Sequence, residues 1–246
     1  MTIKIGVIGA GGMLQYHAAG FRAAGAEILA ICDMNQTAAK KAAELYDVPH
    51  VFSDSSEMLD QLKELDAGSW FSAKFSGEVI PTLEELLMSV KGRITVNIEI
   101  KPESFESPAV PDGIESQICE MVEKLEMVDS VLISSFEHSF FSRIQRWYRN
   151  QSKSTLPNIA PLQEVPLSEE LALGLCSRQG AYSFHPDENF VTPSLIETLK
   201  TDGFRIFPYT INKEKRMEQL IQWGVTGIIS DEPELVWEVI RKLGVD

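Results

Sequence analysis

The sequence has few cysteines, few histidines and no long apolar run. Its three cysteines, Cys32, Cys119 and Cys176, are widely spaced and show no metal-ligand spacing, which excludes a disulfide framework and a zinc site built on cysteines. No apolar run approaches the ~18 residues of a membrane span, and no basic segment followed by an apolar run opens the chain. We therefore expect a cytoplasmic protein with reduced cysteines and no export signal or membrane span.

Basic residues are also scarce. The 22 Lys and Arg residues are outnumbered by 36 Asp and Glu residues, giving a net charge of −14. This balance argues against non-specific binding to nucleic acid or to an anionic membrane. The 44% hydrophobic and 24% charged content is that of an ordinary globular protein. A length of 246 residues fits two small domains or one α/β barrel of about 250 residues.

The opening 60 residues have the pattern of a βαβαβ unit, the first half of a dinucleotide-binding fold. Glycines at Gly9, Gly11 and Gly12 follow the first apolar run and would let the main chain approach a pyrophosphate at a helix N-terminus. Asp33 follows the second strand, where an acid would accept a hydrogen bond from a ribose hydroxyl. The predicted strands are 3–8, 27–32 and 49–52, and the predicted helices are 13–24 and 36–46.

The runs IGVIGAGGM, HAAGF and ILAICDMNQTAA resemble the N-terminal nucleotide-binding segment of the glucose–fructose oxidoreductase and inositol dehydrogenase family. One departure is Leu14, which stands where the third glycine of the fingerprint permits close packing of helix and strand. The remaining chain is too short for the substrate domain of that family. We therefore expect neither a dehydrogenase nor an NAD cofactor, and favour a structural βαβ unit over a nucleotide site.

The stretch 94–101, ITVNIEIK, alternates β-branched and polar residues, which predicts a strand with one buried face. Asn97, Glu99 and Lys101 share one face, and the intervening apolar residues share the other. A buried acid and base cost free energy unless they are paired or bound to something. The pattern predicts either a functional site or a structural ion pair, and the residues alone leave both open.

Six further runs resemble the glycerophosphodiester phosphodiesterases over about residues 60–240. They are LDAGSWFS, IPTLEE, NIEIK, LISSF, PYTIN and GVTGIISD, in that order along the chain. Alternating strand and helix patterns from residue 94 onward also imply parallel strands with right-handed crossovers.

The predicted fold is α/β, a (β/α)₈ TIM-like barrel whose first strands come from the Rossmann-type segment. We expect one domain, with the Rossmann-like segment at 1–60, an insertion and helix at 61–92 and the phosphodiesterase-like remainder at 93–246. The later candidate strands are 94–100, 130–135, 159–162, 181–184, 204–210 and 226–229, which makes nine in all. An eight-stranded barrel then requires 50–52 or 181–184 to lie outside the wall, and an open sheet is the alternative.

The phosphodiesterase resemblance implies a divalent metal, Mg²⁺ or Ca²⁺, held by carboxylates, and two histidines for acid–base work. Glu99 matches the strand carboxylate of the family and Lys101 its neighbouring lysine, so these two are the predicted catalytic residues. Laying the first strands on one another places Asp33 and Asp54 near the other acids, which makes Glu99, Asp33 and Asp54 the predicted metal ligands. The partner implied is a small phosphate-containing ligand.

The family's His-Arg-Gly, Glu-x-Asp and His-Asp motifs are not intact in this sequence. His17 falls in a helix and His50 starts a strand, while His138 and His185 are expected as solvated loop residues. The sequence predicts a recombined or engineered chimera with little or no activity. The alternatives are residual metal-dependent glycerophosphodiester hydrolysis, or phosphate or nucleotide binding at the loop of Gly9, Gly11 and Gly12.

Overall fold

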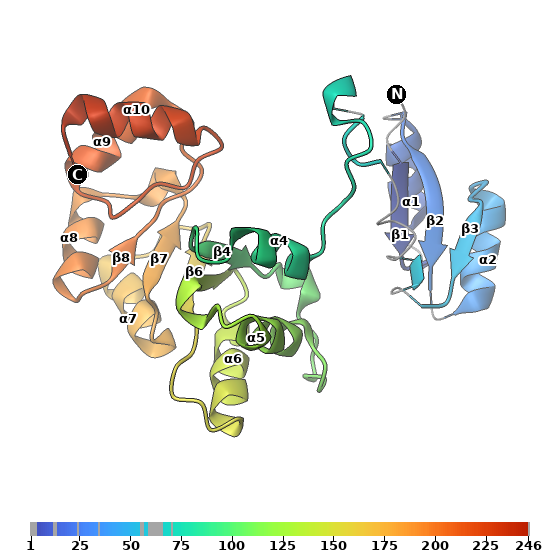
Figure 1. Ribbon diagram of the computed structural model, residues 1–246, viewed down its shortest axis with the longest axis horizontal. Helices are drawn as coiled ribbons and strands as arrows, with labels where there is room; N and C mark the ends of the chain where they lie inside the picture. The colour runs from blue at the N-terminus through green and yellow to red at the C-terminus, as the bar shows by residue number, and fades with distance from the viewer. Residues whose placement is uncertain are drawn as a thin grey trace. The chain divides into compact units, whose positions relative to one another are not determined.

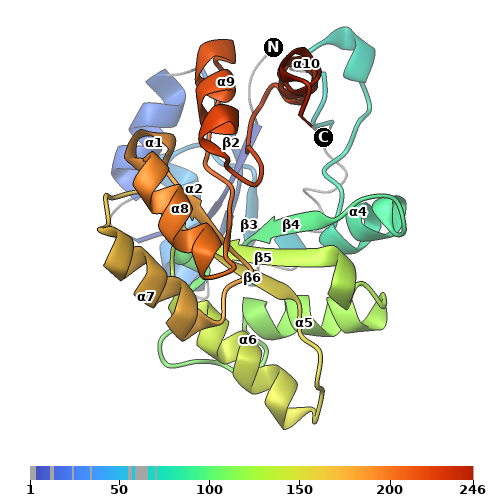
Figure 2. The ribbon, with the colours of Figure 1, turned by 90° about the vertical axis from the view of Figure 1, so that its left-hand side faces the viewer.

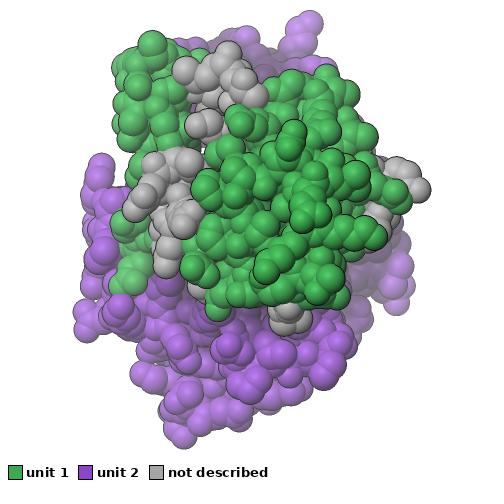
Figure 3. Space-filling view, turned by 90° about the vertical axis from the view of Figure 1, so that its right-hand side faces the viewer, with its two compact units in different colours: residues 1–86 green, residues 87–246 purple. Residues whose placement is uncertain are grey.

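The computed structural model describes residues 4–11, 14–23, 25–33, 35–54, 57–58, 66–69 and 71–245. Gly12 of the predicted glycine loop lies outside the described residues. The chain forms two compact units, residues 1–86 and residues 87–246, which are coloured separately in Figure 3. The expectation of one domain over 1–246 stays a prediction.

Unit 1 is built on a three-stranded parallel sheet of order β1-β2-β3 (Figure 1). Apolar residues of β2 face both ways, and the small residues Ala39, Ala42 and Ala43 form the buried stripe of the second helix. The Asn35 side chain caps that helix by accepting a hydrogen bond from Ala38 N. The elements are β1 Lys4–Ile8, α1 Leu14–Ala23, β2 Glu27–Cys32, α2 Gln36–Leu45 and β3 His50–Phe52.

Leu14, the departure from the glycine fingerprint, is 4% exposed and packs into the apolar core of unit 1. Its neighbours in that core include Ala18 on α1 and Ile28 and Ile31 on β2. The leucine therefore fills the space between helix and sheet instead of allowing the close approach that a glycine permits.

The middle of the chain carries short elements that lead into unit 2. After the single-turn helix Ala73–Phe75, the elements are α4 Leu83–Val90, β4 Val96–Glu99, α5 Ile114–Lys124, β5 Val131–Ser135, α6 Ser139–Asn150, β6 Asn158–Gln163, α7 Glu169–Gln179, β7 Ser183–Pro186, α8 Pro193–Thr201, β8 Arg205–Ile206, α9 Glu214–Trp223 and α10 Pro233–Leu243. No helix among the described residues is long and apolar enough to cross a membrane.

Unit 2 contains a five-stranded parallel sheet of order β4-β5-β6-β7-β8. Helices α5 to α8 cover the outer face of this sheet (Figure 2). Buried apolar residues fill the space between sheet and helices, among them Ile98, Ile133, Ile159, Phe184 and Ile206. The alternation of strands and helices in this unit was predicted correctly as far as β8, but the predicted strand 226–229 is not formed.

The nine-strand count is wrong for the described residues, which form eight strands. The segment 226–229 lies beside β8, but Thr226 N and Gly227 N both donate to the single carbonyl of Ile206, at 3.0 and 3.3 Å, so no regular ladder forms. Pro208 has no N–H to donate and ends β8 early. Of the two segments of which one was expected to lie outside the wall, 50–52 forms β3 and 181–184 overlaps β7.

The inner face of the five-stranded sheet is partly polar. Register places Glu99 of β4 beside Ser134 of β5, and His185 of β7 beside Leu162 of β6. Ser134, Ser183 and His185 are buried at 0%, 0% and 1% exposure. Because the strands run parallel, the carboxyl ends of all five meet at one edge, and Glu99 and His185 lie toward that edge.

Candidate functional site

Glu99 ends β4, and its carboxylate pairs with Lys101. The Lys101 Nζ atom lies 2.7 Å from Glu99 Oε1, and this hydrogen bond raises the pKa of the Lys101 ammonium group. The expected burial of this acid–base pair is wrong, because the Glu99 and Lys101 side chains are 31% and 66% exposed. Ile98 and Ile100 on the opposite face are buried, as predicted. The ion pair is formed at the rim of the sheet and not in its core.

The carboxyl ends of β4 and β5 are tied together by Ser135, which is fully buried. Its hydroxyl donates to the Ile100 carbonyl at 2.7 Å and accepts from Glu137 N at 3.0 Å. These bonds fix the direction in which the main chain leaves β4, and therefore the position of Lys101. Ser135 therefore helps to position this edge of the sheet.

The loop that follows Lys101 is held by Arg143 from α6. The Arg143 guanidinium forms an ion pair with the buried carboxylate of Glu115 at 3.2 Å and donates to the Glu106 carbonyl at 2.6 Å. It also stacks over the Phe105 ring, 4.0 Å from its centroid. Three contacts from one side chain thus hold the segment between β4 and α5.

Tyr209 is a half-buried residue at the same edge that the sequence did not single out. Its hydroxyl donates to the Gln163 carbonyl at 3.0 Å, and its ring meets Phe136 edge to face. Burial, and then the nearby carboxylates of Asp187, Glu164 and Glu99, raise its pKa to about 12. Tyr209 therefore stays protonated at neutral pH and acts as a hydrogen-bond donor.

His185 is not the solvated loop residue that the sequence predicted. It lies on β7 with its Nε2 atom 2.9 Å from the Ser183 hydroxyl, and its Nδ1 atom has no hydrogen-bond partner among the described residues. Burial lowers its pKa to about 4, so the ring is neutral at pH 7. The expected strand ended at residue 184, whereas β7 continues through His185 and closes at Pro186. The alternation Ser183-Phe184-His185 was the available signal.

His138 is not a solvated loop residue either, because it lies at the N-cap of α6 and is half-buried. Its Nε2 atom lies 2.9 Å from the Leu162 carbonyl, and its ring stacks against Phe141. His17 lies in α1 and His50 starts β3, as predicted.

Asp33 follows β2, and both of its carboxylate oxygens accept main-chain hydrogen bonds. Ala10 N donates to Oδ2 and Asn35 N donates to Oδ1, each at 2.7 Å. These donors, Ala10 first, lower the pKa of the Asp33 carboxyl. In the same loop Gly9 N donates to the Cys32 carbonyl at 2.8 Å, and Gly11 O accepts from Leu14 N. The predicted ribose and phosphate roles of Gly9, Gly11 and Asp33 stay predictions. The main-chain N–H groups of Gly9 and Ala10 already donate hydrogen bonds within the protein.

The predicted metal ligands Asp33 and Asp54 lie in unit 1 and Glu99 lies in unit 2, so a site shared by the three stays a prediction. Among the described residues, no group of three or more His, Cys, Asp or Glu side chains could hold an ion. Glu99 is paired with Lys101, Asp33 is bonded by main-chain N–H groups, and Asp54 follows β3 as an exposed residue. Neither unit by itself therefore offers a fitting site for the implied Mg²⁺ or Ca²⁺ among its described residues. The three cysteines are free, as expected, and all three are buried.

Two family models match this sequence. The glycerophosphoryl diester phosphodiesterase family matches residues 43–235, and the oxidoreductase family with an NAD-binding Rossmann fold matches residues 3–77. The two matches overlap over 43–77, so they do not mark a boundary. The junction predicted near 53–62 stays a prediction.

Relatives and solved structures agree with the larger match. A glycerophosphodiester phosphodiesterase from Caldanaerobacter subterraneus subsp. tengcongensis is 35% identical over 187 residues, covering 76% of this chain and 72% of the relative. One from Bacillus subtilis is 26% identical, covering 74% of this chain and 64% of the relative.

Among solved structures, a phosphodiesterase from Oleispira antarctica, in complex with its product sn-glycerol-3-phosphate, has a TM-score of 0.57 at 21% identity. It covers 74% of this chain and 70% of that chain. A glycerophosphodiester phosphodiesterase from Agrobacterium tumefaciens has a TM-score of 0.56 at 22% identity, covering 77% and 72%. These likenesses show an α/β fold of TIM-barrel type. With a family model matching most of its length, this chain belongs to the glycerophosphoryl diester phosphodiesterase family.

Proposed function

We propose that this chain is a phosphodiesterase-family scaffold with little or no hydrolytic activity. The observation that carries the proposal is the Glu99–Lys101 ion pair at the carboxyl end of β4, which stands without the histidines that hydrolysis needs. The sequence contains no His-Arg-Gly and no His-Asp, because its four histidines are followed by Ala18, Val51, Ser139 and Pro186. The chain thus keeps the Glu99–Lys101 end of β4 but has other residues in place of the family's acid–base histidines.

Hydrolysis of a phosphodiester needs a group that protonates the leaving alkoxide and a group that deprotonates the nucleophile. Removing one general acid or base typically lowers a rate by about 10²–10⁴-fold. His185 does not replace them, since it is 1% exposed and bonded to Ser183. His138 Nε2 is engaged with the Leu162 carbonyl. Neither histidine is free to exchange a proton with a substrate in this arrangement.

The retained edge still suits a glycerol phosphate group. Lys101 is two-thirds exposed and pairs with Glu99, whose carboxylate is one of the charges that raise the pKa of Tyr209. The Oleispira antarctica relative is described in complex with sn-glycerol-3-phosphate. This supports weak binding of a small phosphate-containing ligand at the Glu99–Lys101 edge, with Lys101 contacting the phosphate.

Release of sn-glycerol 3-phosphate from glycerophosphocholine, with Mg²⁺ or Ca²⁺ added and with both removed by a chelator, tests the proposal. We expect the wild-type chain and the Glu99→Gln variant to give the same rate as buffer. Metal-dependent turnover in the wild type that disappears in Glu99→Gln would establish residual hydrolysis and overturn the scaffold assignment. The Glu103→Gln variant, on an exposed neighbour, controls for loss of one negative charge.

We also propose that β1 to β3 supply the opening strands of the barrel, with β1 pairing against the segment 226–229. Two findings support this: the two family matches lie in chain order, and unit 1 is itself a parallel sheet with helical crossovers. Ile229 N and O are bonded on the β8 side, to Pro208 O and Ile211 N. Because successive residues of a strand present their main-chain groups to opposite sides, Ile228 presents its N–H to the other edge.

A recombined origin, natural or engineered, is part of this proposal. The match to a Rossmann-type oxidoreductase segment followed by a phosphodiesterase remainder supports it. A natural phosphodiesterase whose sequence runs continuously through the equivalent of residues 1–80 with these same glycines would contradict it.

A further inference from the structure

Unit 2 has a cavity at the edge of its sheet opposite Glu99. The cavity has a volume of about 700 Å³, within the usual range of ~300–1,000 Å³ for small-molecule sites. Its lining includes the first residues of β6 and β8, Asn158 and Arg205, together with Tyr182 just before β7. The strands are parallel, so these amino ends lie away from the carboxyl ends that carry the Glu99–Lys101 pair.

The cavity is lined by basic residues, although the protein as a whole is acidic. Arg149, Lys153 and Arg205 line it, and none of its lining residues is acidic, although 36 of the 246 residues in the chain are. Lys153 is paired with Glu123 at 3.0 Å, so its charge is largely neutralised. Arg149 and Arg205 form no ion pair with any residue that the structure describes. Two uncompensated guanidinium groups therefore face one cavity in an acidic protein.

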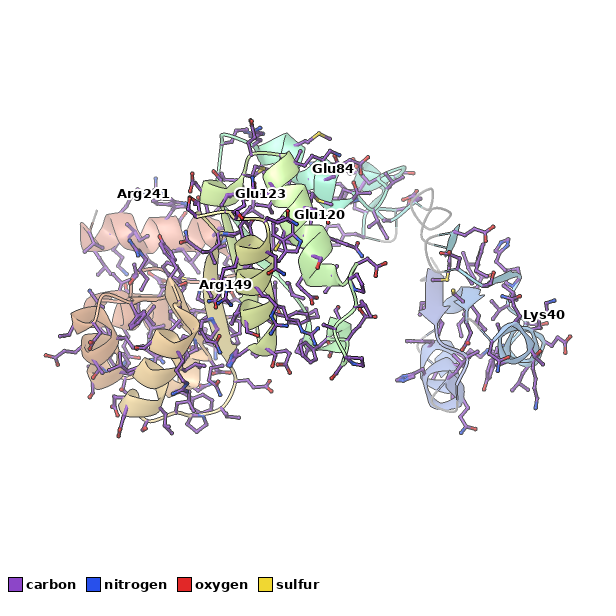
Figure 4. The ribbon with its side chains drawn as sticks, turned by 90° about the horizontal axis from the view of Figure 1, so that it is seen from below. Lys40, Glu84, Glu120, Glu123, Arg149 and Arg241 are labelled. Atoms are coloured by element: carbon purple, nitrogen blue, oxygen red, sulfur yellow. The ribbon has the colours of Figure 1, made fainter. Side chains whose placement is uncertain are left out.

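Both arginines are held in place by neighbouring groups. The Arg205 guanidinium stacks on the Tyr182 ring at 4.1 Å, which covers one face and leaves its N–H edge to meet acceptors in the plane. Arg149, labelled in Figure 4, donates from Nε to the Gln145 carbonyl of its own helix at 3.3 Å. Its two terminal amino groups make no hydrogen bond to the described residues. Planar N–H edges of this kind match phosphate oxygens.

Apart from the polar side chains of Gln145, Ser154 and Asn158, the rest of the lining is apolar or aromatic. Leu156 and Pro157 form one part of the wall, and the Tyr148 and Tyr182 rings another. Such a wall favours a ligand with an organic body over a bare inorganic ion. We propose that this cavity binds a small organic phosphate, with Arg149 and Arg205 contacting the phosphate and the tyrosine side of the wall contacting the body.

Titration of the full chain with phenyl phosphate, followed by amide NMR shifts, tests the proposal. We expect saturable shifts at Tyr182 and Arg205, weaker binding of inorganic phosphate, and no saturable shift with phenol, which has no phosphate. Because a hydrogen bond to a charged group contributes strongly, Arg149→Gln and Arg205→Gln should each weaken binding about tenfold or more. Added salt should weaken binding further.

Arg241→Gln is the matched control, since Arg241 is an exposed arginine on α10 outside the cavity. Equal binding by Arg205→Gln, Arg149→Gln and Arg241→Gln would overturn the proposal, as would the absence of saturation up to about 10 mM phenyl phosphate. Glu99→Gln should leave binding unchanged. Loss of binding in that variant would place the ligand at the β4 edge and contradict a separate site.

Discussion

Each unit ends a parallel strand with a carboxylate, and the two carboxylates are held by different kinds of group. Asp33, after β2, accepts hydrogen bonds from the main-chain N–H groups of Ala10 and Asn35. Glu99, at the end of β4, pairs with the side-chain ammonium of Lys101. Main-chain donors are fixed by the fold, whereas a lysine side chain is flexible and can turn to another partner. The comparison makes Asp33 a part of its own loop and Glu99 a group that remains available.

The largest expected effect concerns how unit 2 holds the loop after Glu99. Arg143→Ala removes the partner of the Glu115 carboxylate, which is 5% exposed, and leaves an uncompensated buried charge. We expect a loss of about 3–5 kcal/mol in the free energy of unfolding of unit 2. Urea unfolding measures it, with Arg146→Ala on the exposed side of α6 as the control. Equal losses in the two variants would show that the Glu115 pair does not hold this loop.

Acid should weaken unit 2 through His185. Its folded pKa of about 4 lies below the ordinary value of 6.5, so the unfolded chain binds the proton first as the pH falls. The stabilisation is complete above pH 6.5 and is lost as the pH falls toward 4, by about 3 kcal/mol in total. Unfolding midpoints at neutral and acid pH measure this loss. It should shrink in His185→Gln and persist in His17→Gln, which changes an exposed histidine of unit 1. An unchanged loss in His185→Gln would contradict the neutral buried ring.

A smaller effect is expected in unit 1, where the carboxylate is bound by the main chain. The pKa of Asp33 is lowered by its N–H donors, so its contribution is present above the ordinary carboxyl pKa and is lost as the pH falls through the lowered value. In Asp33→Asn the Ala10 amide should exchange its hydrogen faster at neutral pH, while Glu44→Gln on the exposed side of α2 leaves it unchanged. If exchange at Ala10 is the same in both variants, Asp33 does not hold the glycine loop.

The smallest effect on stability is expected at Glu99. An exposed ion pair contributes little to folding, so Glu99→Gln should leave the unfolding midpoint unchanged. The pKa of Lys101 should fall toward its ordinary value, because Glu99 is the main cause of its rise. NMR titration of the Lys101 Nζ group measures this shift. Glu103→Gln should move the Lys101 pKa less, and a larger shift there would contradict the pairing seen at 2.7 Å.

The order of strands and helices could be predicted from periodicity, because apolar residues of the buried strands and helix stripes recur at fixed spacing. The face pattern of β4 was also readable, with Ile98 and Ile100 buried opposite Glu99. The exposure of the Glu99–Lys101 pair could not be predicted from the sequence, because alternation indicates which residues share a face and not what covers that face. The burial of His185 was missed because the expected strand, 181–184, stopped one residue short of it, whereas β7 runs on to Pro186.

The roles of the predicted site residues depend on partners that are distant in the sequence. Asp33 lies 23 residues from Ala10, and no local pattern shows that the Ala10 N–H reaches its carboxylate. Tyr209 lies 46 residues from the carbonyl of Gln163 that it binds. The basic cavity likewise combines α6, β6 and β8, and its arginines, Arg149 of α6 and Arg205 of β8, are far apart along the chain. Such groupings follow from the packing of the sheet and only the structure reveals them.

We propose that the opening segment completes the fold of the family but lacks the histidine motifs that carry its catalysis. Hydrogen exchange at the Ile228 amide tests it most directly, because that N–H has no main-chain partner within the described residues and would gain one if β1 pairs beside it. We predict slow exchange at Ile228, comparable to that of Gly227, whose N–H is already bonded to the Ile206 carbonyl. Exchange at the rate of an unprotected amide at Ile228, with Gly227 still protected, would contradict barrel closure by the first strands.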